Sequence, residues 1–349
     1  MDICAFLCGP FCKKLQCFKL EVREKLHIFT TCTLQKKGKI DDALHLGNFA
    51  DLDARETSKR WTRRLELEGG PGVPARDLYQ GSHWKESLVV EETARDLELS
   101  PDLWVLSAGY GLLHADETTV PYAASFAPGE DSIQNLKWRD SVPALHRPRY
   151  WWDWVNQREG GEGLGRFLGN KGDTIYLFVL SQEYYAALEH ELLELIGSGR
   201  NVILISAGLY RQRNKVAPMV RPHILPFSDR FKQVDPYLNK VNVTLNVRLA
   251  KWLIANFAEK LAGGVDVLVP LVQEVADSVP DPERKPVNRM TDEEVLAFIG
   301  KHFGPKHDSA TKLLRKLRDE EGLSCEQKRF GSLFRRFENN QQPNLFGDE

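Results

Sequence analysis

Two adjacent carboxylates, Asp116 and Glu117, lie in a segment that is rich in aromatic and small residues. The segment covers residues 103–126 and reads LWVLSAGYGLLHADETTVPYAASF. A carboxylate can align a water molecule and offset the positive charge of an oxocarbenium-like transition state, while tyrosine rings stack on a leaving ring. These side chains therefore fit hydrolysis at an anomeric carbon, with Asp116 and Glu117 as catalytic candidates. Adjacent acids in a loop are also commonly only solvated, and that alternative stays open.

The segment must be positioned by a strand that ends inside it. Its first residues, 103–106, are apolar and predict a buried strand, and Ser107-Ala108-Gly109 predict the start of a loop. Ligands of open α/β sheets bind at the carboxyl edge of the strands, so we expect the loop to lie at such a site. The polar and aromatic residues of the expected loop are Tyr110, Gly111, His114, Asp116, Glu117, Tyr122 and Ser125.

Three further apolar runs predict strands at residues 25–33, 174–180 and 201–205, and helices are expected at 84–97 and 183–196. The alternation of strands and helices indicates an α/β fold with a parallel sheet, which we assign to residues 23–275. The strand at 201–205 ends in Ser206-Ala207-Gly208, which repeats Ser107-Ala108-Gly109. Either the backbone approaches a ligand closely at both turns, or helices cross there.

Nucleotide hydrolysis at a Walker site, dinucleotide redox chemistry and metalloprotease chemistry are disfavoured because their sequence motifs are missing. The chain has no P-loop, GxGxxG, GxSxG or zinc signature, and we expect neither a cofactor nor a bound metal. Four of the six cysteines, at positions 4, 8, 12 and 17, recur at helix-face spacing rather than as paired metal ligands. Residues 1–22 are therefore interpreted as a poorly ordered extension, and the thiols as reduced and cytoplasmic. No apolar run approaches the roughly 20 residues that span a membrane.

The carboxy-terminal part predicts a small basic helical domain. A proline-rich linker is expected at 276–288, a helical domain at 289–338 and a disordered tail at 339–349. Within the domain, residues 309–318 and 325–337 have the pattern of two basic amphipathic helices joined by Gly322-Leu323-Ser324, which resembles a helix-turn-helix. An ordinary solvated helical hairpin is the alternative.

Cations in three regions are candidates for contacts with DNA phosphates, although the formal net charge of the chain is only −2. One follows the first strand, others follow the strand at 201–205, and the rest lie in the helical domain. These candidates are Lys36, Arg211, Arg213, Lys312, Arg315, Lys316, Lys328 and Arg329. A tryptophan-rich insertion at 138–154 with neighbouring arginines could stack on bases, or its tryptophans could pin a loop to the core.

Three successive blocks, IFTTCTLQKKGK, PARDLYQGSHWKES and WVLSAGYGLLHADETTVPY, resemble a widespread bacterial and phage domain of unknown function. In that family a first strand ends in a Cys-Ser-like turn, ARxLYxG precedes a helix, and SAxYGLL, an acidic turn and Pro-Tyr follow. The resemblance covers residues 25–126, and Thr33 stands where the family often has serine. Members are similar to uracil-DNA-glycosylase-like α/β domains. Among them the chain most resembles antiphage DNA glycosylases that remove hypermodified cytosines from phage DNA.

The resemblance implies a three-layer fold and a base that is flipped out of duplex DNA before its glycosidic bond is hydrolysed, leaving an abasic site. Asp116 would polarise water with Glu117 as a substitute, and Tyr110 and Tyr122 would sandwich the base. Arg211 and Arg213 would hold phosphates or a sugar appendage. The residues expected around the base are Cys32, Thr33, Ser107, Tyr110, Gly111, Tyr122 and Ser125.

Two other functions remain open from the residues. The chain could be a binding module that senses modified DNA without catalysis, or an enzyme that acts on free nucleosides as a hydrolase or deoxyribosyltransferase. The expected partner is double-stranded DNA with modified bases, such as glucosylated hydroxymethylcytosine, and we expect neither a membrane nor an obligate protein partner.

Overall fold

The computed structural model describes residues 24–50, 52–68, 70–158, 161–169, 174–239, 242–280, 290–304, 309–323 and 325–341. The chain divides into two compact units, Met1–Asp281 and Pro282–Glu349. The expected extension at 1–22, with its four cysteines, lies outside the described residues, as do most of the expected linker and residues 342–349. In the part of the chain that the structure describes, no helix is long and apolar enough to cross a membrane.

A five-stranded sheet forms the centre of the first unit, in the order β4-β3-β1-β6-β7. Its strands are β1 (Lys25–Thr31), β3 (Ser100–Ser107), β4 (Gly111–His114), β6 (Thr174–Val179) and β7 (Asn201–Ile205). All neighbours except β3 and β4 are parallel, and Ile28 of β1 pairs with Leu103 on one side and Leu177 on the other. The predicted α/β fold with a mostly parallel sheet is confirmed.

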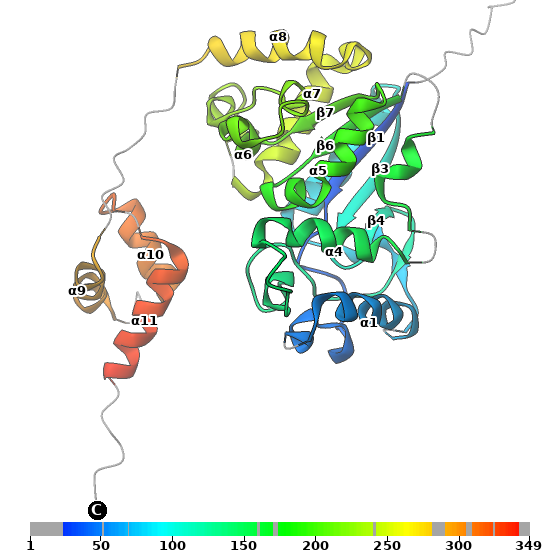
Figure 1. Ribbon diagram of the computed structural model, residues 1–349. Helices are drawn as coiled ribbons and strands as arrows, with labels where there is room; N and C mark the ends of the chain where they lie inside the picture. Colours follow the sequence, from blue (N-terminus) through cyan, green and yellow to red (C-terminus); the bar gives the residue numbers. More distant parts are fainter. Residues whose placement is uncertain are drawn as a thin grey trace, which may run out of the picture. The chain divides into compact units, whose positions relative to one another are not determined.

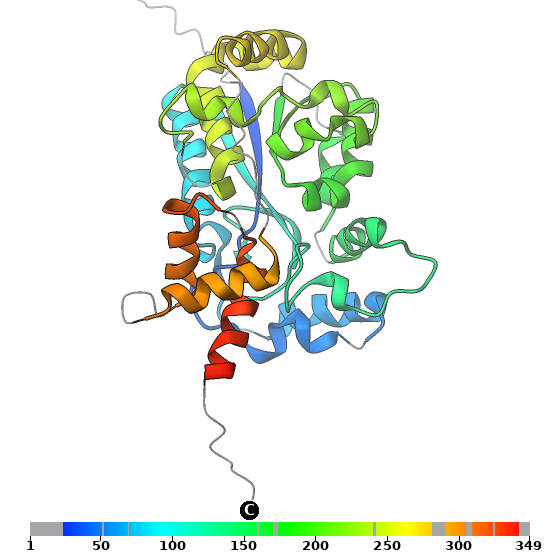
Figure 2. The same cartoon turned by 90° about the vertical axis from the view of Figure 1, so that its left-hand side faces the viewer.

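Helices cover both faces of the sheet (Figures 1 and 2). On one face α3 (Ser82–Asp96) packs against α7 (Leu245–Phe257), and on the other α4 (Arg147–Val155) packs against α5 (Gln182–Gly197). The strands are buried on both faces, and the rings of Phe29 and Phe178 stack with centroids 4.1 Å apart. This burial explains why the parallel strands read as continuous apolar runs. The predicted helices at 84–97 and 183–196 correspond to α3 and α5.

The expectation of a long loop after Ser107 was wrong. The chain turns back at once and forms β4, antiparallel to β3, with Ser107 opposite Gly111 and Trp104 opposite His114. Gly111 has φ +76°, a backbone conformation that glycine adopts without strain and that permits this tight turn. Because β4 runs back along β3, the residues after it are carried away from the carboxyl edge of the sheet.

A helix that the sequence analysis did not predict, α1 (Ala54–Leu67), lies near the carboxyl ends of the strands (Figure 1). Asp53 caps it, and its carboxylate accepts hydrogen bonds from the backbone N–H groups of Arg55 and Glu56. Its buried side chains include Trp61 and Leu65. Besides short 3-10 helices, the other strands and α-helices described in this unit are β2 (Val73–Pro74), α2 (Ala75–Leu78), β5 (Thr118–Thr119), α6 (Ala207–Arg211) and α8 (Gly264–Asp277).

The described residues of the second unit form three helices with their own hydrophobic core. These are α9 (Asp292–His302), α10 (Ala310–Asp319) and α11 (Gln327–Gln341), and Thr291 and Glu294 form a capping box at the start of α9. The core includes Val295, Leu313 and Phe330. Two helices extend past the expected boundaries: α8 ends at Asp277, where the linker was expected from 276, and α11 ends at Gln341, where the tail was expected from 339.

Candidate functional site

The turn between β3 and β4 is built on Ser107. Its Oγ accepts hydrogen bonds from the backbone N–H groups of Gly109 (3.1 Å) and Tyr110 (2.9 Å) and shares a hydrogen bond of 2.6 Å with the hydroxyl of Tyr122. A Cβ atom on Gly109 would lie 2.4 Å from Cε2 of Tyr122. The close approach at this turn is therefore made by a ring of the protein itself.

Two tryptophans fix the same turn from neighbouring helices. The indole N–H of Trp61 in α1 donates to the carbonyl of Gly109 at 2.8 Å, and that of Trp151 in α4 donates to the carbonyl of Ala108 at 2.7 Å. Both tryptophans are fully buried. Part of the tryptophan-rich insertion thus pins the chain to the core, as one of the two interpretations expected.

Of the other tryptophans of the insertion, Trp152 forms a hydrogen bond to a residue outside the turn, and Trp138 and Trp154 lie closer to the surface. Trp152 donates its indole N–H to the half-buried carboxylate of Glu191 at 2.7 Å. Trp138 and Trp154 are half-buried and stack with centroids 5.5 Å apart. Trp154 also lines a surface hollow that is described below.

Hydroxyl groups gather at the ends of β1 and β3. The hydroxyl of Tyr122 also bonds to that of Tyr79 (2.9 Å), and Sγ of Cys32 lies 3.0 Å from the hydroxyl of Tyr184. Burial raises the pKa of Tyr79, Tyr122 and Tyr184 well above the usual value, so these groups are neutral. The structure thus brings Cys32, Ser107 and Tyr122 together as predicted, but in a packed cluster.

Lys36 belongs to this cluster. Its Nζ lies 4.1 Å from the ring centroid of Tyr122 and donates to the carbonyl of Thr33 at 2.9 Å. Burial lowers the pKa of Lys36, opposed by the charges of Cys32 and Asp131. The ammonium group is therefore directed at an aromatic face and a carbonyl, which differs from the solvated or phosphate-binding position that the sequence suggested.

The remaining expected base-binding residues have local roles. Thr33 donates its hydroxyl to the carbonyl of Gln35, and Ser125 accepts from the N–H of Ala127, both at 3.0 Å. Gly111 makes the β3–β4 turn. Thr33 and Ser125 are half-buried, and neither lines the hollows described below.

His83, which the sequence analysis did not single out, lies beside the end of β1. Its Nε2 is 3.1 Å from the Thr30 hydroxyl and 3.3 Å from that of Thr31. Burial lowers the pKa of His83. The ring is therefore held neutral against the strand.

Tyr110 and Tyr122 contact each other directly. Their rings meet edge to face with centroids 5.3 Å apart, and the Tyr110 hydroxyl accepts from the N–H of Val120 at 3.0 Å. Their exposed fractions are 7% and 0%. In this arrangement no space remains between the rings for a base, which corrects the expected sandwich.

Asp116 lies away from the cluster. Because the N–H of Ala115 bonds to the carbonyl of Leu103, Asp116 is roughly 13 Å along β3 from Ser107. Its side chain is 59% exposed and pairs with Arg76, whose guanidinium also contacts Glu91 at 3.1 Å. The hydrogen bond from Arg76 lowers the pKa of Asp116. Asp116 is thus an ion-pair partner beside the sheet.

Glu117 is held by a second arginine. Its Oε1 lies 2.9 Å from Nη2 of Arg158, and Oε2 accepts from the N–H of His114 at 3.4 Å. Arg158 also donates to the carbonyls of Tyr110 (2.9 Å) and Leu112 (3.2 Å), so its position is fixed by three acceptors. The Glu117 side chain remains 36% exposed. It is therefore both fixed and open to solvent.

Glu117 lines a hollow of about 490 Å³, which is within the usual size range of ligand sites. Its other acids are Glu66 and Glu68, its cation is Arg158, and Tyr110 forms part of its wall. Asp116 is not among the lining residues. The full lining is Thr62, Leu65, Glu66, Glu68, Gly70, Gly72, Tyr110, Glu117, Thr118, Thr119, Val120 and Arg158.

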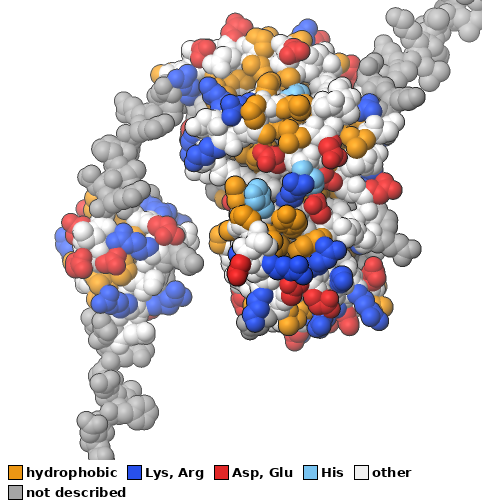
Figure 3. Space-filling model, in the orientation of Figure 1, with side chains coloured by type: hydrophobic (Ala, Val, Ile, Leu, Met, Phe, Trp, Pro, Cys, Tyr) orange, Lys and Arg blue, Asp and Glu red, His pale blue; other side chains and the backbone are white. Residues whose placement is uncertain are grey.

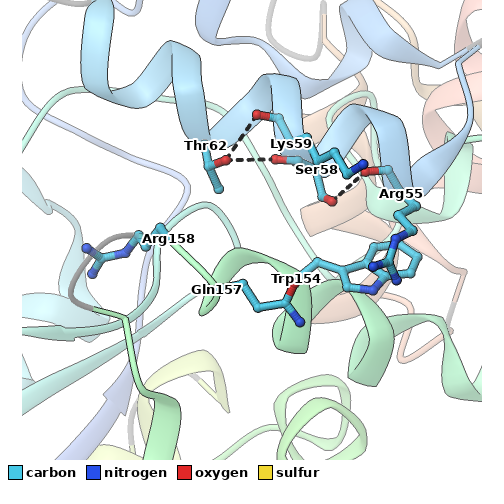
Figure 4. A pocket seen from close by; sticks show the side chains of 7 residues that line it. All are labelled: Arg55, Ser58, Lys59, Thr62, Trp154, Gln157 and Arg158. Atoms are coloured by element: carbon cyan, nitrogen blue, oxygen red, sulfur yellow. Dashed lines mark hydrogen bonds between the residues drawn. The ribbon is translucent and has the colours of Figure 1, made fainter.

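A second hollow of about 210 Å³ adjoins the first and shares Thr62 and Arg158 with it. Figure 4 shows residues of α1 and of the end of α4 around it, with Arg55 pointing toward Trp154. The full lining is Arg55, Ser58, Lys59, Thr62, Trp154, Gln157 and Arg158. The charged residues of the first hollow are thus mainly acids and those of the second are all cations, and Arg158 is shared by both.

Sequence reasoning missed most of this site because it missed α1. The signal was present: Asp53 is an N-cap residue, and Ala54, Ser58, Trp61 and Leu65 recur at the spacing of a helix face. The high charge of residues 40–75 obscured this spacing. Arg158 follows α4 in an irregular segment and had no such signal.

The expected DNA-binding cations differ in their surroundings. Arg211, Arg213 and Arg315 are exposed, and Arg213 also lies over the ring of Tyr210. Lys316 pairs with Glu320, and Arg329 pairs with Asp292. Lys312 is exposed at the start of α10. The side chain of Lys328 lies outside the described residues.

No family model, curated protein or solved structure matches the chain. Among the described residues no group of three or more His, Cys, Asp and Glu side chains is arranged to hold a metal ion.

Proposed function

We propose that this protein is a DNA glycosylase that hydrolyses the N-glycosidic bond of a modified base and leaves an abasic site. The observation that carries the proposal is the pair of adjoining hollows. The one with Glu117, Glu66 and Glu68 suits the positive charge that develops on a sugar, and the one with Arg55 and Lys59 suits the phosphates next to it.

In this proposal Glu117 takes the role that the sequence assigned first to Asp116. Its carboxylate aligns water, whose oxygen bonds to C1′ of the deoxyribose while the electrons of the C1′–N bond leave with the base. The proton released by water passes to Glu117 and then to the departing base. Arg158 keeps the carboxylate in place through the 2.9 Å contact. Asp116 is paired with Arg76 outside this hollow.

The proposed substrate is glucosylated hydroxymethylcytosine, a hypermodified cytosine of phage DNA, and the proposed role is antiphage defence. The mostly parallel α/β sheet is compatible with a three-layer uracil-DNA-glycosylase-like fold, and the SAGYGLL block supports the assignment to that group. The base must be flipped out of the duplex to reach the acid-lined hollow. The basic helices α10 and α11 would hold the flanking duplex.

The test is incubation of the full-length protein with unmodified DNA and with phage DNA carrying glucosylated hydroxymethylcytosine. Release of base is followed by mass spectrometry and abasic sites by alkaline cleavage. We expect release only from the modified DNA. Glu117→Gln should lower the rate about 100-fold or more, because general base catalysis typically contributes that much.

The matched control is Asp116→Asn, which removes a neighbouring charge outside the hollow and should keep most of the activity. The circular dichroism spectrum and DNA affinity of Glu117→Gln should equal those of the wild type. Modified DNA that is bound but never cleaved would contradict the proposal and favour a sensor. Release from free nucleosides but not from DNA would favour a nucleoside hydrolase.

A further inference from the structure

We infer that the cation-lined hollow between α1 and α4 is a subsite for the sugar–phosphate backbone of the DNA strand that carries the flipped nucleotide, next to the sugar at which hydrolysis occurs. The inference rests on the proposed function and deepens it, because it names the residues that hold the backbone beside the reacting nucleotide.

All charged residues that line this hollow are positive. Its seven lining residues include Arg55, Lys59 and Arg158 and no acid. Arg55 and Lys59 are exposed and form no ion pair within the described ranges of the chain. They are four residues apart on α1, so their side chains share one face of the helix. Two cations on one face can contact neighbouring phosphates of a strand.

Arg55 is held ready for an anion by an aromatic ring. Its guanidinium carbon lies 5.6 Å from the ring centroid of Trp154, and Trp154 in turn stacks on Trp138. Arg147 lies over Trp138 at 5.8 Å. A cation–π contact restrains the long side chain but leaves its N–H groups able to donate to phosphate oxygens. Figure 3 shows a band of Lys and Arg side chains beside hydrophobic atoms between α4 and α1.

The two hollows are linked through a fixed residue. Arg158 lines both, and the carbonyls of Tyr110 and Leu112 and the carboxylate of Glu117 hold its guanidinium. A strand whose phosphates lie on Arg55 and Lys59 therefore has its next sugar close to Glu117. An acidic peptide could occupy the cationic hollow, but it carries no group that suits the acids of the adjoining one.

The test measures binding of the full-length protein to a short fluorescent oligodeoxythymidylate over a series of salt concentrations. Each phosphate contact to a single strand contributes about 0.7 to the slope of log K against log salt. The double variant Arg55→Ala/Lys59→Ala should therefore have a slope shallower by about 1.4. The control Arg60→Ala/Arg63→Ala removes the same charge from α1 at positions that line neither hollow, and should keep the wild-type slope.

Equal slopes for the wild type and the Arg55/Lys59 variant would overturn the inference. Competition by an acidic peptide or by inorganic phosphate as effective as that by the oligonucleotide would also overturn it, in favour of a protein partner or a lone anion. Glu117→Gln separates the two proposals, since it should bind the oligonucleotide with the wild-type slope while losing base release. If Glu117→Gln releases base at the wild-type rate while Arg55→Ala/Lys59→Ala shows the shallower salt dependence, the catalytic role of Glu117 is refuted and the backbone subsite is retained.

Discussion

Gly109 and Gly208 occupy equivalent places in two Ser-Ala-Gly turns, but their surroundings differ. A Cβ on Gly109 would lie 2.4 Å from the fully buried ring of Tyr122, whereas a Cβ on Gly208 would meet Gln182 at 3.6 Å, an ordinary contact. At the first turn the small residue is required by packing. At the second turn Ser206 caps α6, and glycine is not required.

We therefore expect Gly109→Ala to lower the free energy of unfolding by about 1–3 kcal/mol, the usual cost of overpacking a core. Gly208→Ala is the matched control. It lies inside α6, where alanine is favoured over glycine by up to about 1 kcal/mol, so it should be neutral or stabilising. Urea unfolding of both variants measures the difference, and equal destabilisation would show that Tyr122 can shift away from the turn.

His27 couples stability to pH. It is 2% exposed, Nδ1 accepts the indole N–H of Trp104 at 3.1 Å, and the ring of Phe167 lies 4.9 Å away. Asp102 lies 3.3 Å from the same nitrogen, but because Nδ1 accepts from Trp104 the ring is neutral. Burial lowers the pKa of His27 to about 4, with Asp102 opposing.

Between pH 6.5 and pH 4 the unfolded state binds a proton at His27 that the folded state does not, so stability falls as the pH falls through this window. Between about pH 7.5 and about pH 5 the loss from His27 should be about 2 kcal/mol. His27→Asn keeps an acceptor for Trp104 and does not titrate. Urea unfolding at both pH values should therefore show a smaller pH dependence for His27→Asn, and an unchanged dependence would mean that other groups cause it.

At the scale of elements, the sequence predicted what depends on local pattern. Apolar runs identified β1, β3, β6 and β7, and the helices α3 and α5 between them followed within two residues of their bounds. The hairpin of β3 and β4 was missed because GLLH is short and its pairing depends on a single turn at Gly111. Because the hairpin was not predicted, Asp116 and Glu117 were expected at the carboxyl end of β3, whereas Ala115, next to Asp116, bonds to Leu103 nearer the start of the strand.

The site was predictable only in part for the same reason. Cys32, Ser107 and Tyr122 meet because parallel strands place their carboxyl ends at one edge. The acid-lined hollow instead forms where α1 and the segment after α4 meet Tyr110 of the β3–β4 turn and the residues of β5, which are distant in sequence. Arg158 joins Glu117 across 41 residues, and no local pattern indicates such a contact.

At the scale of the whole molecule, two separate hydrophobic cores imply two folding units of very different size. The helical unit has a core of few residues, among them the fully buried Phe330, Leu313 and Leu317, while the α/β unit buries an extensive sheet. A small domain buries a smaller fraction of its surface and is correspondingly less stable. We therefore expect the helical unit to unfold first.

Phe330→Ala tests this independence. Removing a buried phenylalanine side chain costs about 3–5 kcal/mol, a large share of the stability of so small a unit. Calorimetry should show the smaller transition lost or shifted far down, and the larger transition unchanged. Phe227→Ala, at an equally buried position of the α/β unit, should lower the larger transition instead.

If the helical unit binds duplex DNA, Phe330→Ala should also lose duplex affinity while still releasing base from a short single-stranded substrate. A shift of both transitions in Phe330→Ala would show that the two units unfold cooperatively. A loss of duplex affinity would then result from destabilisation of the whole molecule and would not identify α10 and α11 as the duplex-binding helices.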